Sequence, residues 1–212
     1  IQSKVGESFN MARSSELNEL MRRRRKENIL QVALQQFTRK GLFATKVKDI
    51  AEEAGMAQGL IYHYYNSKVD IYVELINNAL DKMEEAVTML KESPLSPADK
   101  IKQAVINLME TIKTSDDFVQ TCRLIAQATN TTAIPEEAKE LIEMKRDKPY
   151  QAIAQIIAEG QKDKTIVNAD PIQLAILFWT TINGLAIYVA TRGEQHDLPE
   201  AKIIYNIFLE GV

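Results

Sequence analysis

Apolar residues recur every three or four positions through most of the chain, which is the spacing of one face of an α-helix. Between residues 27 and 40 these positions are Ile29, Ala33, Leu34 and Phe37. Gly41 follows them as a helix stop. Beyond Pro94 the helical period persists, without the apolar–polar alternation that marks a strand. The pattern therefore predicts an all-α protein.

Two short apolar stretches follow the first helix. The first is ended by Gly55, whose residue type suits the positive φ of a tight turn, and its apolar positions are Val47, Ile50, Ala51 and Ala54. After three turn residues, residues 58–65 are expected to form the second short helix. Two short helices joined by a glycine-containing turn have the spacing of a helix-turn-helix, here over residues 47–65.

A long fourth helix is expected to begin at Ser67, because Asp70 three residues later completes the pattern of a capping box. Further helices with proline or acidic starts are expected at residues 97–113, 116–130, 135–162, 171–192 and 199–210. Pro149 lies inside the third of these and is expected to kink or split it. The chain should therefore hold about nine helices. We expect a three-helix head at residues 21–66 and a larger helical bundle at residues 67–212.

The net charge of −3 conceals an asymmetry between these parts. Residues 21–70 hold ten Lys/Arg against five Asp/Glu, whereas residues 71–212 hold fourteen against twenty-one. A basic head suggests that this end meets a polyanion, although an uneven solvated surface gives the same counts. The five cations Arg22–Lys26 stand where a helix dipole disfavours them, so a disordered arm that orders on phosphate or in a minor groove is expected. A solvated basic face is the alternative.

The chain lacks the residue patterns of an enzyme. Its histidines, His63 and His196, have no metal-ligand spacing, and there is no phosphate-cradling glycine loop or nucleophile elbow. Cys122 has no identified histidine partner and is expected to be a buried hydrophobe. We therefore expect no catalytic residue, no metal and no cofactor. A single cysteine and the lack of a signal-peptide pattern favour the cytoplasm.

The uncharged run at residues 172–191 is long enough to cross a membrane. It contains Gln173, Thr180, Thr181 and Asn183, however, and no second span accompanies it. A helix that is apolar nearly all round is otherwise a buried one, and in a chain of this size full burial needs a partner subunit. We therefore expect a homodimer and no membrane contact.

The order of residues around the predicted helix-turn-helix resembles the N-terminal signature of the tetracycline-repressor (TetR) family. The residues that carry the resemblance are Gly41, Thr45, Val47, Asp49-Ile50-Ala51, Ala54-Gly55, Gly59, Tyr62, Tyr65 and Lys68. Tyr65 departs from the phenylalanine usual in the family. A weaker resemblance to the closing helices of the family lies in Glu159-Gly160-Gln161, Asp170-Pro171 and Asn183-Gly184-Leu185.

The start of the third helix is the expected base-reading position. Gln58 can pair bidentately with adenine, and Gly59 permits close approach of the backbone to DNA. An exposed helix start is the alternative for Gln58. The resemblance implies that Tyr62, His63 and Lys68 contact phosphates, and that Thr45 with Lys46 forms a second phosphate clamp. A solvated or packed histidine is the alternative for His63.

The resemblance also implies a small-molecule pocket in the larger C-terminal part, whose occupancy alters the separation of two DNA-reading heads. Adaptable or aromatic candidates for its lining are Met83, Met109, Phe118, Cys122, Met144, Trp179 and Tyr188. The last two helices are expected to pair across a two-fold axis through Leu177, Thr181, Leu185, Ile204, Tyr205 and Phe208.

These features together predict a transcriptional repressor that binds double-stranded operator DNA. A symmetric dimer implies a near-palindromic operator, and the low charge among the pocket candidates favours an apolar effector that releases the DNA. A ligand-independent DNA-binding dimer and an activator are the alternatives.

Overall fold

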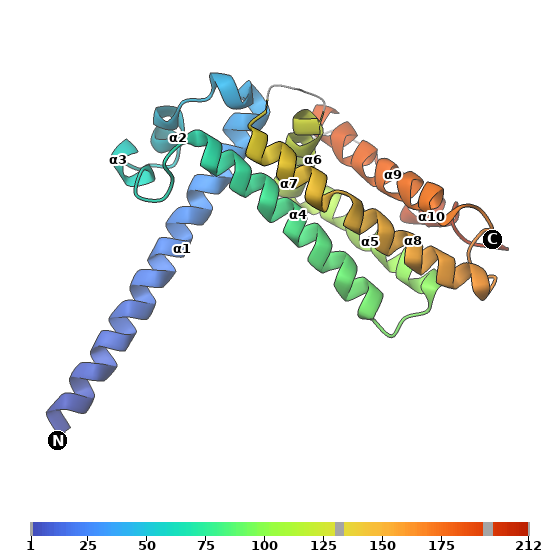
Figure 1. The fold of residues 1–212 in the computed structure, drawn as a ribbon, viewed down its shortest axis with the longest axis horizontal. Helices are drawn as coiled ribbons and strands as arrows, with labels where there is room; N and C mark the ends of the chain where they lie inside the picture. The colour runs from blue at the N-terminus through green and yellow to red at the C-terminus, as the bar shows by residue number, and fades with distance from the viewer. Residues whose placement is uncertain (1, 130–133, 193–196, 212) are drawn as a thin grey trace. The chain divides into compact units, whose positions relative to one another are not determined.

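The computed structural model describes residues 2–129, 134–192 and 197–211, with side chains from Glu16 onward. Ten α-helices and no named strand are found among these residues (Figure 1), so the predicted all-α fold is confirmed. The chain divides into two compact units, Ile1–Tyr72 and Val73–Val212. Each unit has its own buried side chains.

The first unit contains α1 (Gln2–Ala44), α2 (Val47–Glu53), α3 (Gln58–Ile61) and the first turn of α4 (Lys68–Glu92). Its interior is built from the apolar positions that the helical spacing selected, among them Ile29, Ala33, Phe37, Ile50 and Ile61, each at most 1% exposed. The ring of Phe37 meets that of Tyr72 edge-on, with centroids 5.4 Å apart.

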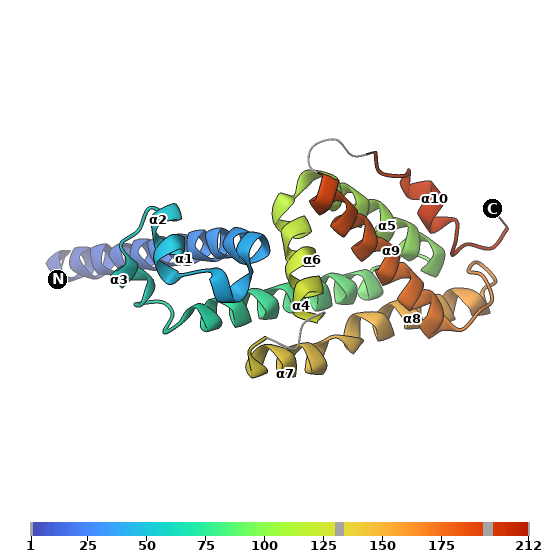
Figure 2. The same cartoon turned by 90° about the horizontal axis from the view of Figure 1, so that it is seen from above.

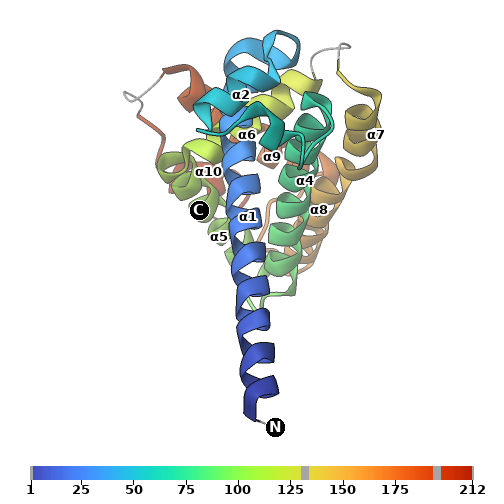
Figure 3. The same ribbon diagram turned by 90° about the vertical axis from the view of Figure 1, so that its left-hand side faces the viewer.

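The basic run Arg22–Lys26 lies within α1, so the expectation of a disordered arm is wrong. The helix extends far upstream of this run, which removes the run from the dipole's positive end. Figure 3 shows the N-terminal half of α1 running beyond α2. At its other end α1 is interrupted by Gly41, whose φ of 80° and ψ of 162° are not helical.

The predicted capping box at the start of α4 is confirmed. The Asp70 amide donates to Ser67 Oγ over 3.2 Å, and the Ser67 amide donates to an Asp70 carboxylate oxygen over 3.2 Å. These reciprocal bonds satisfy amide groups that the first helical turn leaves without backbone partners.

The second unit contains most of α4, α5 (Pro97–Thr114), α6 (Asp116–Thr129), α7 (Glu136–Lys145), α8 (Asp147–Lys162), α9 (Pro171–Arg192) and α10 (Ala201–Tyr205). Figure 2 shows α5, α8 and α9 side by side, and one apolar cluster joins them. Fully buried members of that cluster include Ile101, Val105, Ile156, Phe178 and Phe208.

The expected helix at residues 135–162 is split in two, because α7 ends at Lys145 and α8 begins at Asp147. Pro149 has no N–H to donate to the carbonyl of Lys145, and its ring clashes with that carbonyl in a continuous helix. Near the start of α8 the missing N–H does not destabilise the helix, because the first amides of a helix have no acceptor within it. The indole N–H of Trp179 donates to the carbonyl of Pro149 over 3.2 Å and ties α9 to this turn.

The last predicted helix is shorter than residues 199–210, since α10 covers only Ala201–Tyr205. The chain then turns, and the Glu210 amide donates to the Thr165 carbonyl over 3.1 Å. The Val167 amide donates to the Phe208 carbonyl over 3.0 Å. The tail is thereby fastened to the segment between α8 and α9.

By length and composition α9 could cross a membrane, and a third of its most apolar stretch (33%) is buried inside the structure. One side of α9, including Leu174, Phe178 and Ile182, belongs to the core of the second unit. Another side carries exposed Ile172 and Leu177. This distribution matches a core helix with a second apolar side.

Candidate DNA-binding site

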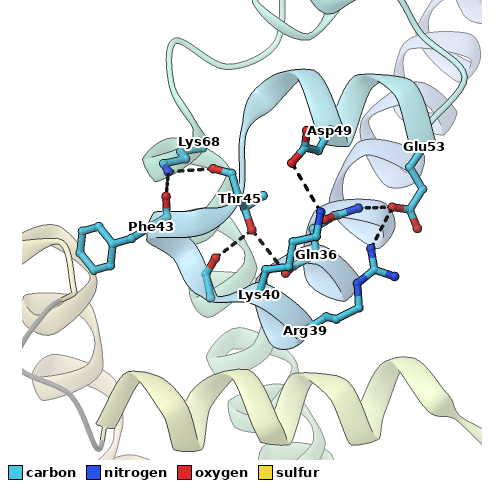
Figure 4. Close-up of polar contacts among 9 residues, drawn as sticks. Gln36, Arg39, Lys40, Phe43, Thr45, Asp49, Glu53 and Lys68 are labelled. Carbon is cyan, nitrogen blue, oxygen red and sulfur yellow. Dashed lines mark hydrogen bonds and ion pairs between the residues drawn. The ribbon is translucent and has the colours of Figure 1, made fainter.

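Polar contacts between α1 and α2 set the position of the short helices (Figure 4). A guanidinium nitrogen of Arg39 lies 3.6 Å from the Glu53 carboxylate, and the Lys40 ammonium lies 3.5 Å from that of Asp49. Gln36 also donates to Glu53. Because α2 has only two turns, these contacts and the buried Ile50 and Ala51 must hold it in place.

The turn between α2 and α3 depends on Gly55, which has a φ of 65°. The following amide, of Met56, donates to the Ala51 carbonyl over 2.9 Å and closes the turn. A side chain at Gly55 would be strained in this conformation. The turn leads directly into α3 at Gln58.

The predicted base-reading residues are exposed at α3, which ends at Ile61 and is shorter than the expected helix over residues 58–65. Gln58 and Gly59 are both exposed, and no atom lies within 4 Å of where a Cβ on Gly59 would stand. Tyr62 is 49% exposed, and His63 beside it is exposed as well. The structure thus groups small and polar groups on one surface, which is what a major-groove helix needs.

Only one of the two residues of the predicted phosphate clamp at the start of α2 is exposed. Lys46 is exposed, but the prediction is wrong for the side chain of Thr45, which is 0% exposed. Its hydroxyl donates to the Gly41 carbonyl over 2.8 Å, and the Thr45 amide donates to the same carbonyl over 3.3 Å (Figure 4). Thr45 is therefore a positioning residue within the head.

Lys68 also has partners inside the head. Its ammonium group donates to the carbonyls of Phe43 and Thr45, each over 2.8 Å (Figure 4). These bonds join the first turn of α4 to the segment between α1 and α2, and they use two of the three N–H donors. The cation at the start of α4 is stabilised by these carbonyls, so it does not need a phosphate.

One positioning residue escaped the sequence interpretation. The side-chain amide of Asn28 donates to the Ala54 carbonyl over 3.0 Å and so ties α1 to the end of α2. Its only sequence signal is a polar amide directly before the buried Ile29.

Residues 29–75 match the family described as bacterial regulatory proteins, tetR family. These residues therefore carry the DNA-binding domain of the tetR family. The matched residues contain α2, α3 and the Gly41–Lys68 signature, so the family match and the exposed surface of α3 coincide.

Curated relatives are HTH-type transcriptional regulators by name. The transcriptional repressor KstR2 of Mycolicibacterium smegmatis is 32% identical over 89 residues, which are 42% of this chain and 43% of that protein. The transcriptional regulator HbdR of Aromatoleum sp. is 32% identical over 81 residues, 38% of this chain and 35% of that protein. This chain therefore spans less than half the length of these relatives.

Solved structures resemble the TetR fold of this chain over most of its length. A transcriptional regulator from Saccharomonospora viridis in complex with choline has a TM-score of 0.69 at 21% identity, covering 87% of this chain and 97% of that one. The ketosteroid regulator KstR2 of Mycobacterium tuberculosis has a TM-score of 0.67 at 20% identity, covering 86% and 89%.

The predicted pocket residues lie in different surroundings. Met109 and Trp179 are buried in the core, and Met83, Phe118 and Cys122 are half-buried against it. Met144, at 65% exposed, and Tyr188, at 37%, lie on the surface. The first five therefore belong to the apolar core of the second unit or border it, whereas Met144 and Tyr188 do not.

An open hollow of about 470 Å³ lies along α4, lined by Asp81, Glu84, Glu85, Thr88 and Met89. Met89 is an adaptable side chain of the kind expected in the pocket, but the hollow contains none of the other predicted lining residues, and its carboxylates do not suit an apolar effector. The hollow is thus distinct from the predicted pocket.

Burial also changes the predicted dimer surface. Ile204 and Phe208 are at most 4% exposed in the core of their own chain, so these two are wrong as partner-facing residues. Thr181, Leu185 and Tyr205 are half-buried, and Leu177 is 40% exposed. The exposed apolar residues next to the buried pair are Ile203 and Ile207.

Proposed function

We propose that the chain is a dimeric transcriptional repressor that binds a near-palindromic operator and releases it when a small apolar molecule binds the second unit. The observation that carries the proposal is the exposed group Gln58 and Gly59 on α3, with Tyr62 and His63 directly after it, in a TetR-type head. A glutamine reading adenine contributes about 1–3 kcal/mol of discrimination. The exposed Lys46 supplies a phosphate contact on the same head.

Exposed apolar side chains support the dimer. Ile172 and Ile176 stand one turn apart on α9, each 45% exposed, and Leu177 beside them is 40% exposed. Ile203 and Ile207 repeat this spacing near the C-terminus, at 57% and 47%. Rows of exposed large apolar residues mark an interaction surface, and a second copy of the chain can cover them symmetrically. We place this dimer in the cytoplasm, with the apolar side of α9 against its partner and not in a lipid bilayer.

The effector proposal rests on the half-buried Met83, Phe118 and Cys122, which pack at the margin of the apolar core. Methionine and thiol side chains adapt to ligands of irregular shape. One protein of similar fold was solved in complex with choline, so a fold of this kind can hold a small molecule.

The function is tested by incubating the purified protein with fragmented genomic DNA of its host and sequencing what it retains as salt increases. Retention of a few palindrome-bearing fragments at moderate salt is expected. Uniform retention that vanishes with salt would mean phosphate-driven binding alone. The matched control is Gln58→Ala, which should keep the low-salt binding and lose the preferred fragments.

Effector control has a second test on the recovered fragment. Apolar compounds are screened for release of the labelled DNA, and release by a compound that leaves a Phe118→Ala variant on the DNA supports the pocket. If no compound releases the DNA, the ligand-independent dimer is favoured. A reporter gene behind the fragment separates repression from activation.

A further inference from the structure

Four guanidinium groups lie side by side on α1 without a partner that would neutralise them. Arg22, Arg23, Arg24 and Arg25 are all exposed, and none of them takes part in an ion pair or hydrogen bond in the described part of the chain. Four like charges within little more than one helical turn repel each other. A polyanion would relieve this repulsion.

This stretch of α1 is attached to the DNA-binding head. The ammonium group of Lys26 lies 5.6 Å from the ring centroid of Tyr65, in the connection between α3 and α4. Two residues further along, Asn28 bonds to the end of α2. The arginines therefore begin directly next to the helix-turn-helix, and not on a remote extension.

Helical geometry divides the four arginines into two pairs. Residues three and four positions apart share a side of a helix, so Arg22 and Arg23 lie on the side of Lys26. That side faces the connection that follows α3, where Tyr62 and His63 are exposed. Arg24 and Arg25 point in other directions around the helix.

We propose that Arg22 and Arg23 bind backbone phosphates of the DNA that flanks the bases read by α3. This rests on the proposed function of α3, and it adds two sequence-independent contacts per head that lengthen the protected DNA on one side. Guanidinium groups suit the task because their N–H donors match phosphate oxygens. An anionic membrane surface is the less favoured partner, because the run adjoins the connection that follows α3 in the DNA-binding head.

The test compares two double variants that remove the same charge, Arg22→Gln/Arg23→Gln and Arg24→Gln/Arg25→Gln. A third variant, Lys82→Gln/Lys113→Gln, removes two exposed, unpaired lysines from the second unit. Binding is measured against salt on a labelled mixed-sequence duplex and on any recovered operator fragment. Hydroxyl-radical footprints on the operator give the length of protected backbone, and far-UV circular dichroism checks folding.

Log K falls as log salt rises. Losing two phosphate contacts should reduce the steepness of that fall by about 1.8 for each head bound. Between 50 and 200 mM salt, the wild type should thus lose about tenfold more affinity per head than Arg22→Gln/Arg23→Gln. The footprint of that variant should shorten on one side of each half-site. The other two double variants should retain the wild-type slope and footprint.

A wild-type slope for Arg22→Gln/Arg23→Gln would overturn the proposal, and so would equal losses for both arginine pairs. If that pair instead abolishes binding to phosphatidylserine vesicles while the DNA slope stays unchanged, a membrane surface replaces DNA as the partner. Failure of the function proposal looks different, because the preferred fragments are then missing for every variant, whereas the slope on the mixed-sequence duplex still tests the arginines.

Discussion

Individual side chains near the end of α1 satisfy backbone carbonyls that the helix leaves exposed. Thr45 donates to the Gly41 carbonyl, and Lys68 donates to those of Phe43 and Thr45. Carbonyls at a helix end need such partners when they are not reached by water. The head therefore uses two residues of its family signature to hold its own backbone.

Lys68→Met should destabilise the folded protein, because two carbonyls lose a charged donor. We expect a loss of about 1–2 kcal/mol in the free energy of unfolding, measured by urea titration. The salt dependence of DNA binding should stay as in the wild type. Lys46→Met is the matched control, since Lys46 is exposed: it should keep wild-type stability and lower the salt slope by about 0.9. The reverse pattern would make Lys68 the phosphate contact.

Gly59→Ala should separate folding from DNA binding. No atom lies within 4 Å of the added Cβ, and alanine favours the helix over glycine by up to about 1 kcal/mol. The midpoint temperature of thermal unfolding should thus be unchanged or slightly higher. Affinity for the operator should fall by roughly tenfold or more, about 1.4 kcal/mol, because the backbone can no longer approach the base edges. Wild-type affinity would show that Gly59 lies away from the DNA.

The Cys122 thiol should be unreactive in the folded protein. Burial raises its pKa to about 11, so about a thousandth of it is thiolate at pH 8. Labelling by a disulfide reagent at pH 8 should be much slower than in urea and should accelerate as the pH rises toward 11. Fast labelling of the native protein at pH 7 would contradict this burial.

The sequence interpretation found the right residues of the head but not all of their partners. Gln58, Gly59, Tyr62 and His63 do lie together on an exposed surface, because helical spacing and the turn at Gly55 place them there. The partners of Thr45 and Lys68 depend on which carbonyls the interruption at Gly41 leaves open. That is a property of the three-dimensional backbone, which residue types do not specify.

Among the helices, α4 is fastened to α7 and α8 by lysines. The Lys145 ammonium donates to Asn77 over 2.8 Å and to the Asp81 carboxylate, and that of Lys148 donates to Glu84 over 2.8 Å. The acceptors stand on α4 at positions four and three residues apart, which share one side of the helix. The two pairs differ in burial, since the Lys145 side chain is 17% exposed and that of Lys148 is 53% exposed.

This difference predicts unequal effects of the same substitution. Lys145→Met removes the one ammonium group that donates to both Asn77 and Asp81, and it should cost about 1–2 kcal/mol of unfolding free energy. Lys148→Met breaks an exposed pair and should cost less than about 1 kcal/mol. Urea unfolding of both variants at equal ionic strength measures the contrast. Equal costs would mean that burial of Lys145 does not strengthen its contacts.

The order of the helices could be predicted from the sequence, but the side of each helix that faces the core could not. The split near Pro149 followed from the missing N–H of proline, which acts locally. The choice of Ile204 and Phe208 as partner-facing residues failed because α10 is short and apolar on two sides. The helical period of apolar residues shows which residues share a side of a helix. Only tertiary packing decides which of two apolar sides meets the core.

For the whole molecule, the dimer proposal predicts that a charge introduced on the exposed apolar side of α9 prevents dimerisation. Ile176→Glu should yield monomers in sedimentation velocity runs, because burying a carboxylate between two apolar surfaces carries a large desolvation penalty. Ile106→Glu on α5 is the matched control, since Ile106 is 44% exposed and Ile176 is 45% exposed. The control should sediment as the wild-type dimer. Dimers of Ile176→Glu would exclude this surface as the interface.

The continuity of α4 decides how the protein can be cut into pieces. The boundary between the two units falls after Tyr72, five residues into a 25-residue helix. A fragment that stops there would keep the capping box but only slightly more than one helical turn, which is too short to stay helical alone. Ile71 and Tyr72 would then lie on a fraying end, although both are nearly fully buried in the intact chain. An independently folding head must therefore carry much of α4 beyond the boundary.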